Sequence, residues 1–131
     1  MYALTIGEVM TPSPHSVGSD QTAKVALGLM RKYNIRHLPV RDNGELVGIV
    51  TDRDIQFALR WDKAEEDRLE ISDTCVPDPY VVRSSKLLHE VVDEMASQKL
   101  GCAIVVDDSG PIGIFTMVDA CRVLARFLSG S

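Results

Sequence analysis

The sequence predicts a mixed α/β (α+β) fold, built from two βαββα repeats that pack through their sheets with pseudo-twofold symmetry. Three observations favour it. The chain of 131 residues matches itself at a shift of 65 residues, each copy carries one apolar stripe at helical spacing, and each copy carries two strand-like segments joined by a turn. A unit of about 60 residues buries little apolar surface alone. Two copies that share a core are therefore expected.

The repeat runs through both copies without a gap. Its densest match places Gly48-Ile49-x-Thr51-x-x-Asp54 over Gly113-Ile114-x-Thr116-x-x-Asp119. Further matched pairs, in chain order, are Ile6 and Ile71, Pro12 and Pro77, Val17 and Val82, Met30 and Met95, Val40 and Val105, and Asp42 and Asp107. We therefore expect repeat 1 at residues 1–60, a charged connector at 61–68, repeat 2 at 69–128 and a tail at 129–131.

Each copy begins with a turn that contains two prolines, Met10–Pro14 and Cys75–Pro79. Proline fixes φ and lacks an N–H donor, so these segments are predicted to be extended or turned. A short strand follows, near 15–18 and 80–83. The helix after it shows an apolar stripe in each copy. Its members are Val25, Ala26, Leu29, Met30 and Tyr33, and then Leu88, Val91, Val92, Met95 and Ala96.

A strand pair and a closing helix complete each copy. In the first copy, strands at 37–41 and 46–51 flank Asn43-Gly44, a pair that suits the positive φ of a hairpin turn. In the second copy the strands fall at 102–106 and 112–116. Closing helices are predicted from about 52 to 59 and from about 117 to 128. The last of them carries an apolar face that either packs in the core or contacts a partner, formed by Val118, Cys121, Ala125 and Leu128.

Composition narrows the classes of function. A net charge of −5 gives no basic face for nucleic acid, and no apolar run approaches the roughly 20 residues that span a membrane. No secretory signal is visible at the N-terminus, so a cytoplasmic protein is expected. Cys75, Cys102 and Cys121 form no CxxC pair and are predicted to be reduced and buried, and the histidines show no metal-binding spacing. Trp61, alone in the charged connector, either lies over the core edge or anchors an interface.

The Thr-x-x-Asp motif, Thr51 with Asp54 and Thr116 with Asp119, is the candidate site in each copy. Each motif joins a strand to the first turn of a helix, where free N–H groups and the helix dipole favour anions. The carboxylate there can accept hydrogen bonds from a ribose diol. The same spacing is also a capping box, in which threonine and acid stabilise the helix start. Spacing alone leaves both interpretations open.

Three segments together resemble the CBS domain, named after cystathionine β-synthase. They are Val9–Pro12, Arg36–Val40 and Gly48–Ile55, and the second half of the chain resembles the same motif. The chain thus resembles a tandem CBS pair, or Bateman module, over nearly its whole length. The resemblance implies a regulatory module that binds an adenosyl ligand (AMP, ADP, ATP or S-adenosylmethionine) in clefts between the copies. A module of this kind is expected to need no cofactor.

The resemblance also implies residue roles. Ribose is expected at Thr51 and Asp54, and at Thr116 and Asp119. Adenine is expected beside the second strand, at Arg36, His37, Leu38 and Pro39. The other side of the pocket is expected to be closed by Thr11, Ser13 and Ser16.

The first motif is predicted to favour phosphate, because charge-assisted hydrogen bonds are the stronger ones. Its cationic candidates are Arg36, His37 and Arg53. The second copy has Gly101, Cys102 and Val118 at the corresponding positions. The second copy also differs from the first in having Ile104 in place of Pro39 and Met117 in place of Asp52.

The resemblance further implies a homodimer and a separate effector protein. A ligand-independent dimerisation or interaction module, in which Thr-x-x-Asp only caps helices, remains the alternative. An enzyme is not expected, since the sequence shows neither a P-loop nor GxGxxG, nor a nucleophile at readable spacing from a base.

Overall fold

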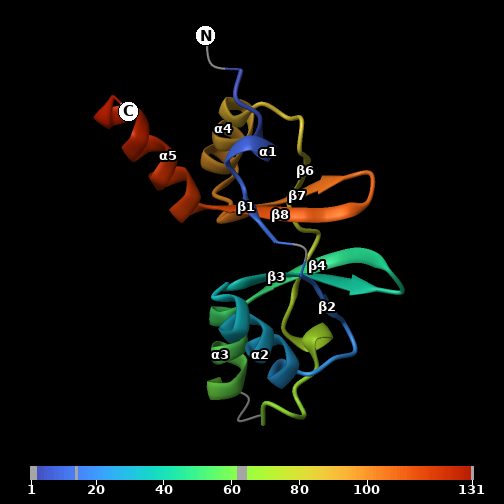
Figure 1. Ribbon diagram of the computed structural model, residues 1–131. Coiled ribbons are helices and arrows are strands. Elements are labelled where there is room, and N and C mark those ends of the chain that lie inside the picture. Colours follow the sequence, from blue (N-terminus) through green and yellow to red (C-terminus); the bar gives the residue numbers. More distant parts are fainter. Residues whose placement is uncertain (1–2, 14, 62–64, 131) are drawn as a thin grey trace. The chain divides into compact units, whose positions relative to one another are not determined.

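The computed structural model describes residues 3–13, 15–61 and 65–130, and the chain divides into two compact units. The continuous unit is His15–Pro79. The split unit combines described residues 3–13 with 80–130, so it is built from both ends of the chain. The described residues form two four-stranded sheets and five α-helices, which confirms the mixed α+β class (Figure 1).

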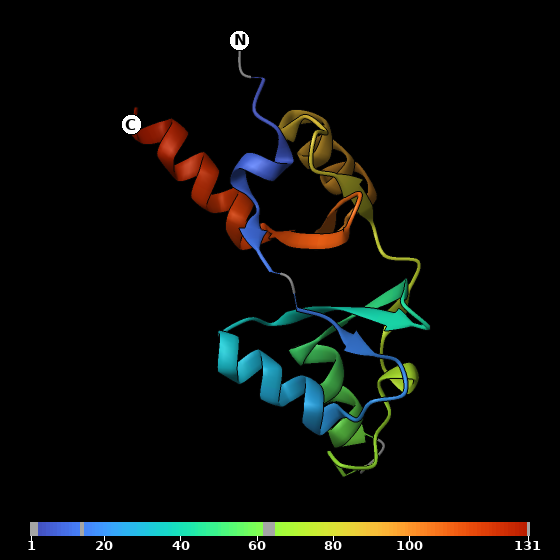
Figure 2. The same cartoon turned by 45° about the vertical axis from the view of Figure 1, so that its right-hand side comes forward.

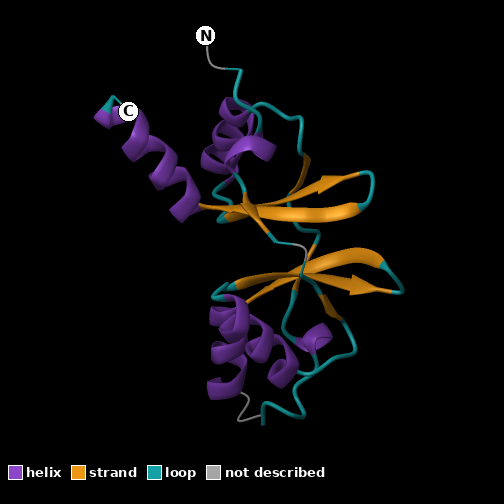
Figure 3. Cartoon of the chain, viewed as in Figure 1, coloured by secondary structure: helices purple, strands orange, loops and turns teal. Residues whose placement is uncertain are grey.

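The sheet of the continuous unit has the strand order β2-β3-β4-β5. Strand β2 (Val17–Gly18) is parallel to β3 (His37–Asp42), which forms an antiparallel hairpin with β4 (Glu45–Thr51), and β5 (Val76–Pro77) closes the edge. Asn43 and Gly44 have φ of 52° and 82°, as the hairpin turn requires. Helices α2 (Ala23–Tyr33) and α3 (Asp52–Trp61) cover one face of this sheet, and the 3₁₀ turn η1 spans Ile71–Asp73 (Figure 3).

The sheet of the split unit has the strand order β1-β8-β7-β6. Its strands are β1 (Thr11–Pro12), β6 (Val81–Arg83), β7 (Cys102–Asp107) and β8 (Gly110–Thr116), and its helices are α1 (Ile6–Val9), α4 (Leu88–Gln98) and α5 (Met117–Ser129). Helix α5 leaves the end of β8 and projects away from α4, as two views of this unit show (Figures 1 and 2). No helix in the described ranges has the length and apolarity to cross a membrane.

Each sheet takes an edge strand from the other sequence copy. Strand β1 pairs with β8, placing Pro12 opposite Gly113, and β5 pairs with β4, placing Pro77 opposite Gly48. A Cβ at Gly48 would lie 2.7 Å from the Val76 carbonyl oxygen, and one at Gly113 would lie 2.9 Å from that of Thr11. Both glycines thus allow the close approach of a neighbouring backbone.

The residues buried on α2 and α4 agree in part with the apolar stripes predicted for these helices. Met30 on α2, like Val91 and Met95 on α4, is buried as predicted, but Val25 and Tyr33 are substantially exposed. The buried face of α2 is instead rotated toward the residues at positions 23, 26, 27 and 30, which follow the i, i+3, i+4, i+7 spacing of one helix face. Tyr33 stacks on the ring of His15 at a centroid distance of 3.6 Å, which accounts for its place outside the stripe.

The closing helices extend further than predicted, α3 to Trp61 and α5 to Ser129. Trp61 is 69% exposed and contacts the Phe57 ring at a centroid distance of 5.8 Å, so it does not cover the core edge. The prediction that all three cysteines are buried is wrong, because Cys121 lies on an exposed face of α5 and Cys75 and Cys102 are only partly buried. Positions 14, 62–64 and 131, which the sequence assigns to a proline turn, the connector and the tail, lie outside the described residues.

Candidate functional site

The second Thr-x-x-Asp motif forms a capping box at the start of α5. Thr116 ends strand β8, and its Oγ1 accepts a hydrogen bond from the Asp119 amide at 3.4 Å. In return, Oδ2 of Asp119 accepts a 2.8 Å hydrogen bond from the Thr116 amide. The capping interpretation of this motif is therefore confirmed by the geometry.

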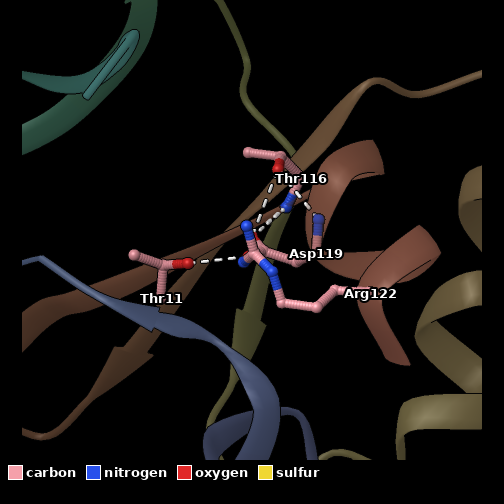
Figure 4. Close-up of polar contacts among 4 residues, drawn as sticks. All are labelled: Thr11, Thr116, Asp119 and Arg122. Carbon is pink, nitrogen blue, oxygen red and sulfur yellow. Dashed lines mark hydrogen bonds and ion pairs between the residues drawn. The ribbon is translucent and has the colours of Figure 1, made fainter. Parts of the chain in front are cut away.

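Asp119 also binds two groups outside its own cap (Figure 4). Its Oδ1 accepts a 2.7 Å hydrogen bond from the Thr11 hydroxyl on β1, and it lies 3.2 Å from a guanidinium nitrogen of Arg122. Asp119 is only 4% exposed. A buried carboxylate needs such partners, since an unpaired one is costly to desolvate. This side chain thus ties β1, the end of β8 and the first turns of α5 together.

A cavity of about 250 Å³ lies beside this carboxylate, within the split unit. Its polar and charged lining residues include Thr11, Asp119, Arg122 and Arg126. The other lining residues are Glu8, Val9, Met10, Pro12 and Val123. The cavity therefore lies next to a buried carboxylate, that of Asp119, and next to the two side chains that contact it, the hydroxyl of Thr11 and the cationic Arg122. Such a combination suits a small polar ligand.

The first motif is capped in the same way but is less tightly held. The Asp54 amide donates to Oγ1 of Thr51 at 3.0 Å, and the Thr51 amide donates to Oδ2 of Asp54 at 3.3 Å. The Thr74 hydroxyl binds only the backbone carbonyl of Asp54, at 3.0 Å. The Asp54 carboxylate, which is half-buried, therefore has fewer side-chain partners than Asp119 among the described residues. Burial raises the pKa of the nearby Cys75 thiol, and the charge of Asp54 adds to the rise.

The proposed adenine and phosphate residues are distributed over both units. His37 begins β3 opposite Thr51, and Leu38 and Pro39 continue the buried strand. Arg36 has a side chain that is 79% exposed and pairs with Asp52 at 3.4 Å, while Arg53 is exposed on the first turn of α3.

Thr11, Ser13 and Ser16 are divided between the two units. Ser16 belongs to the continuous unit, whereas Thr11 and Ser13 belong to the split unit, where Thr11 contacts the second motif. Ser13 is buried, and its Oγ has no hydrogen-bond partner among the described residues.

Arg122 and Arg126 are the cavity residues that sequence reasoning missed. The signal was present, because Arg122 follows Asp119 by three residues and so shares its helix face. At the repeat distance of 65 residues, Phe57 and Trp61 take these two positions in the first copy. The same helix face is therefore cationic in the split unit and aromatic in the continuous unit.

No group of three or more His, Cys, Asp or Glu side chains able to hold a metal ion occurs in ranges 3–13, 15–61 and 65–130.

Curated relatives include proteins of two kinds. Inosine-5'-monophosphate dehydrogenase of Nitrosopumilus maritimus is 34% identical over 115 residues, which is 86% of this chain but only 23% of the enzyme. A CBS domain-containing protein of Dictyostelium discoideum is 31% identical over 134 residues and is matched over 92% of its length. The chain thus spans less than a quarter of the enzyme it matches and nearly all of the smaller protein.

Solved structures match almost the whole chain. The CBS domain pair of protein MJ0100, in complex with 5'-methylthioadenosine and S-adenosyl-L-methionine, aligns with a TM-score of 0.82 and 26% identity, covering 95% of this chain and 98% of that one. CBSX2 in complex with AMP aligns with a TM-score of 0.71 and 30% identity, covering 94% and 97%. A sequence model of the CBS domain matches residues 6–60 and 71–126. The chain therefore belongs to the CBS domain family, as a tandem pair.

Proposed function

We propose that this CBS pair is a non-catalytic regulatory module that binds an adenosyl ligand at its Thr-x-x-Asp motifs. The buried carboxylate of Asp119, next to a cavity of about 250 Å³, is the observation that carries the proposal. Ribose would bind Thr51 and Asp54 in one motif, and Thr116 and Asp119 in the other. Each carboxylate would accept hydrogen bonds from the ribose hydroxyls, as acidic residues do in dinucleotide folds.

Two related CBS pairs support the choice of ligand. One is in complex with AMP, and the other with 5'-methylthioadenosine and S-adenosyl-L-methionine. The three compounds share adenine and ribose and differ in charge at the 5' position. An adenosine moiety is therefore the common chemistry, and AMP, ADP, ATP and S-adenosylmethionine are the candidates for this chain.

A thermal-shift scan with these four candidates tests the proposal. A ligand present at 100 times its dissociation constant stabilises the folded state by about 2.7 kcal/mol, so its midpoint of unfolding should rise by several degrees. GMP serves as the matched control, since it keeps ribose and phosphate but changes the base. A scan in which no adenosyl compound shifts the midpoint would favour the ligand-independent interaction module.

We also propose that the chain forms a homodimer through α5. The helix exposes a row of large apolar side chains, and a groove of about 420 Å³ between α4 and the start of α5 has a largely apolar lining. The exposed side chains are Met117, Val118, Leu124, Phe127 and Leu128. An exposed row of large apolar side chains is typical of a protein interface. A second copy supplies the same face, as a twofold dimer requires.

Light scattering after gel filtration tests the dimer. We expect a mass near twice the chain's 14.4 kDa, and a shift toward the monomer for Leu124→Ser with Phe127→Ser. Arg53→Ser, an exposed change on α3, is the control and should leave the mass unchanged. A wild-type protein that elutes as a monomer at every concentration would rule out this proposal.

The proposed role further includes a cytoplasmic location and a separate effector protein that the module regulates.

A further inference from the structure

The two Thr-x-x-Asp motifs differ most in the helix face that follows each aspartate. In the split unit Arg122 and Arg126 lie one and two turns after Asp119, and both line the cavity. In the continuous unit Phe57 and Trp61 hold the matching positions. Only the second motif therefore has, among the described residues, a cation in contact with its carboxylate.

The guanidinium of Arg122 is available for a second partner. Its side chain is 58% exposed, and one of its nitrogens lies 3.2 Å from Oδ1 of Asp119. Arginine carries five N–H donors in a planar fork, and a fork of this kind binds phosphate in a bidentate manner. The N–H groups of Arg122 that do not contact Asp119 can therefore bind an anion next to a ribose held by Asp119.

The acidic group that shares the cavity is already engaged. Glu8 accepts a 2.8 Å hydrogen bond from the Thr5 amide, and so caps helix α1. Asp119 receives two donors on Oδ1, the hydroxyl of Thr11 and the guanidinium of Arg122. A diol that replaces them would satisfy the carboxylate and free the guanidinium for phosphate.

We propose that the second motif binds a 5'-phosphorylated ribonucleoside, with Asp119 holding the ribose and Arg122 holding the phosphate. This inference rests on the function proposed above. It places the phosphate site in the copy opposite to the one that the sequence favours, where Arg36, His37 and Arg53 are the candidates. Arg126, one turn beyond Arg122, adds positive potential at the same wall of the cavity.

A site-resolved titration tests the inference. ¹⁵N-labelled protein is titrated with AMP and with adenosine, and the dissociation constants are read from the amides of Thr116 and Asp119. Arg122→Gln should weaken AMP at these amides by at least about 10-fold, the effect of losing one charged hydrogen bond. Adenosine, which lacks the phosphate, should change by less than about 2-fold.

Two further variants complete the design. Arg122→Lys keeps the charge and should retain part of the AMP affinity, and Arg53→Gln removes a cation beside the first motif and should change nothing at Thr116. Unchanged AMP binding in Arg122→Gln, or AMP shifts confined to Thr51 and Asp54, would overturn the inference and leave the proposed function standing. If neither AMP nor adenosine moves any amide of either motif, the proposed function itself fails.

Discussion

Replacing Asp119 with alanine should lower the free energy of unfolding by about 2–4 kcal/mol. The change removes the acceptor of the Thr116 amide, of the Thr11 hydroxyl and of Arg122 at once. Loss of a helix cap costs about 0.5–2 kcal/mol, and hydrogen bonds to a charged group contribute about 1.5–3 kcal/mol. Urea unfolding followed by circular dichroism measures the difference.

Asp54→Ala is the matched control for Asp119→Ala. Within the part of the chain that the structure describes, the Asp54 carboxylate has only its cap contact with the Thr51 amide, at 3.3 Å, so a loss of about 0.5–1.5 kcal/mol is expected. A double-mutant cycle between Thr11→Val and Asp119→Ala isolates the link to β1, and we expect a coupling of about 1 kcal/mol. Equal losses for Asp54→Ala and Asp119→Ala, with no coupling to Thr11, would contradict the tie between β1 and α5.

Gly113→Ala should destabilise the protein by about 1–3 kcal/mol, the usual range for overpacking. A Cβ at this position would lie 2.9 Å from the carbonyl oxygen of Thr11, so strand β1 would have to move away from β8. Gly48→Ala should act in the same way on β5, because its Cβ would lie 2.7 Å from the Val76 carbonyl oxygen. Chemical unfolding measures both losses.

Gly28→Ala provides the opposite control. Gly28 lies inside helix α2 with no atom within 4 Å of an added Cβ. Alanine is favoured over glycine in a helix by about 0.5–1 kcal/mol, so this variant should be more stable than wild type. A loss at Gly28 similar to that at Gly113 would show that the effect is not one of close backbone contact.

Local sequence patterns predicted most of the fold. The Asn43-Gly44 turn placed the first hairpin, since few residue pairs adopt positive φ so readily, and the repeat carried that assignment to the second copy. The Thr-x-x-Asp spacing left capping and ligand contact open, and the structure shows a capped helix start at both motifs. Membership of the CBS family, inferred from the same segments, is confirmed by the match over residues 6–60 and 71–126.

The exchange of edge strands could not be predicted from the same patterns. Strands β1 and β5 have two residues each, which is too short to show alternation of apolar and polar side chains. The Thr11–Asp119 contact joins residues 108 positions apart, and a repeat analysis compares positions without indicating which copies touch. The exposure of the apolar face of α5 could not be predicted either, because an apolar helix face has the same sequence whether it lies in a core or on a surface.

The split unit has a consequence for how the protein is made. The continuous unit is complete once the ribosome has passed residue 79, whereas the split unit needs the last strand and helix before its first strand can pair. During synthesis the N-terminal segment must therefore wait, unpaired, while the continuous unit folds. A nascent chain halted between the two repeats would expose this segment and the edge of an unfinished sheet, which makes that stage the one most open to aggregation or to chaperone binding.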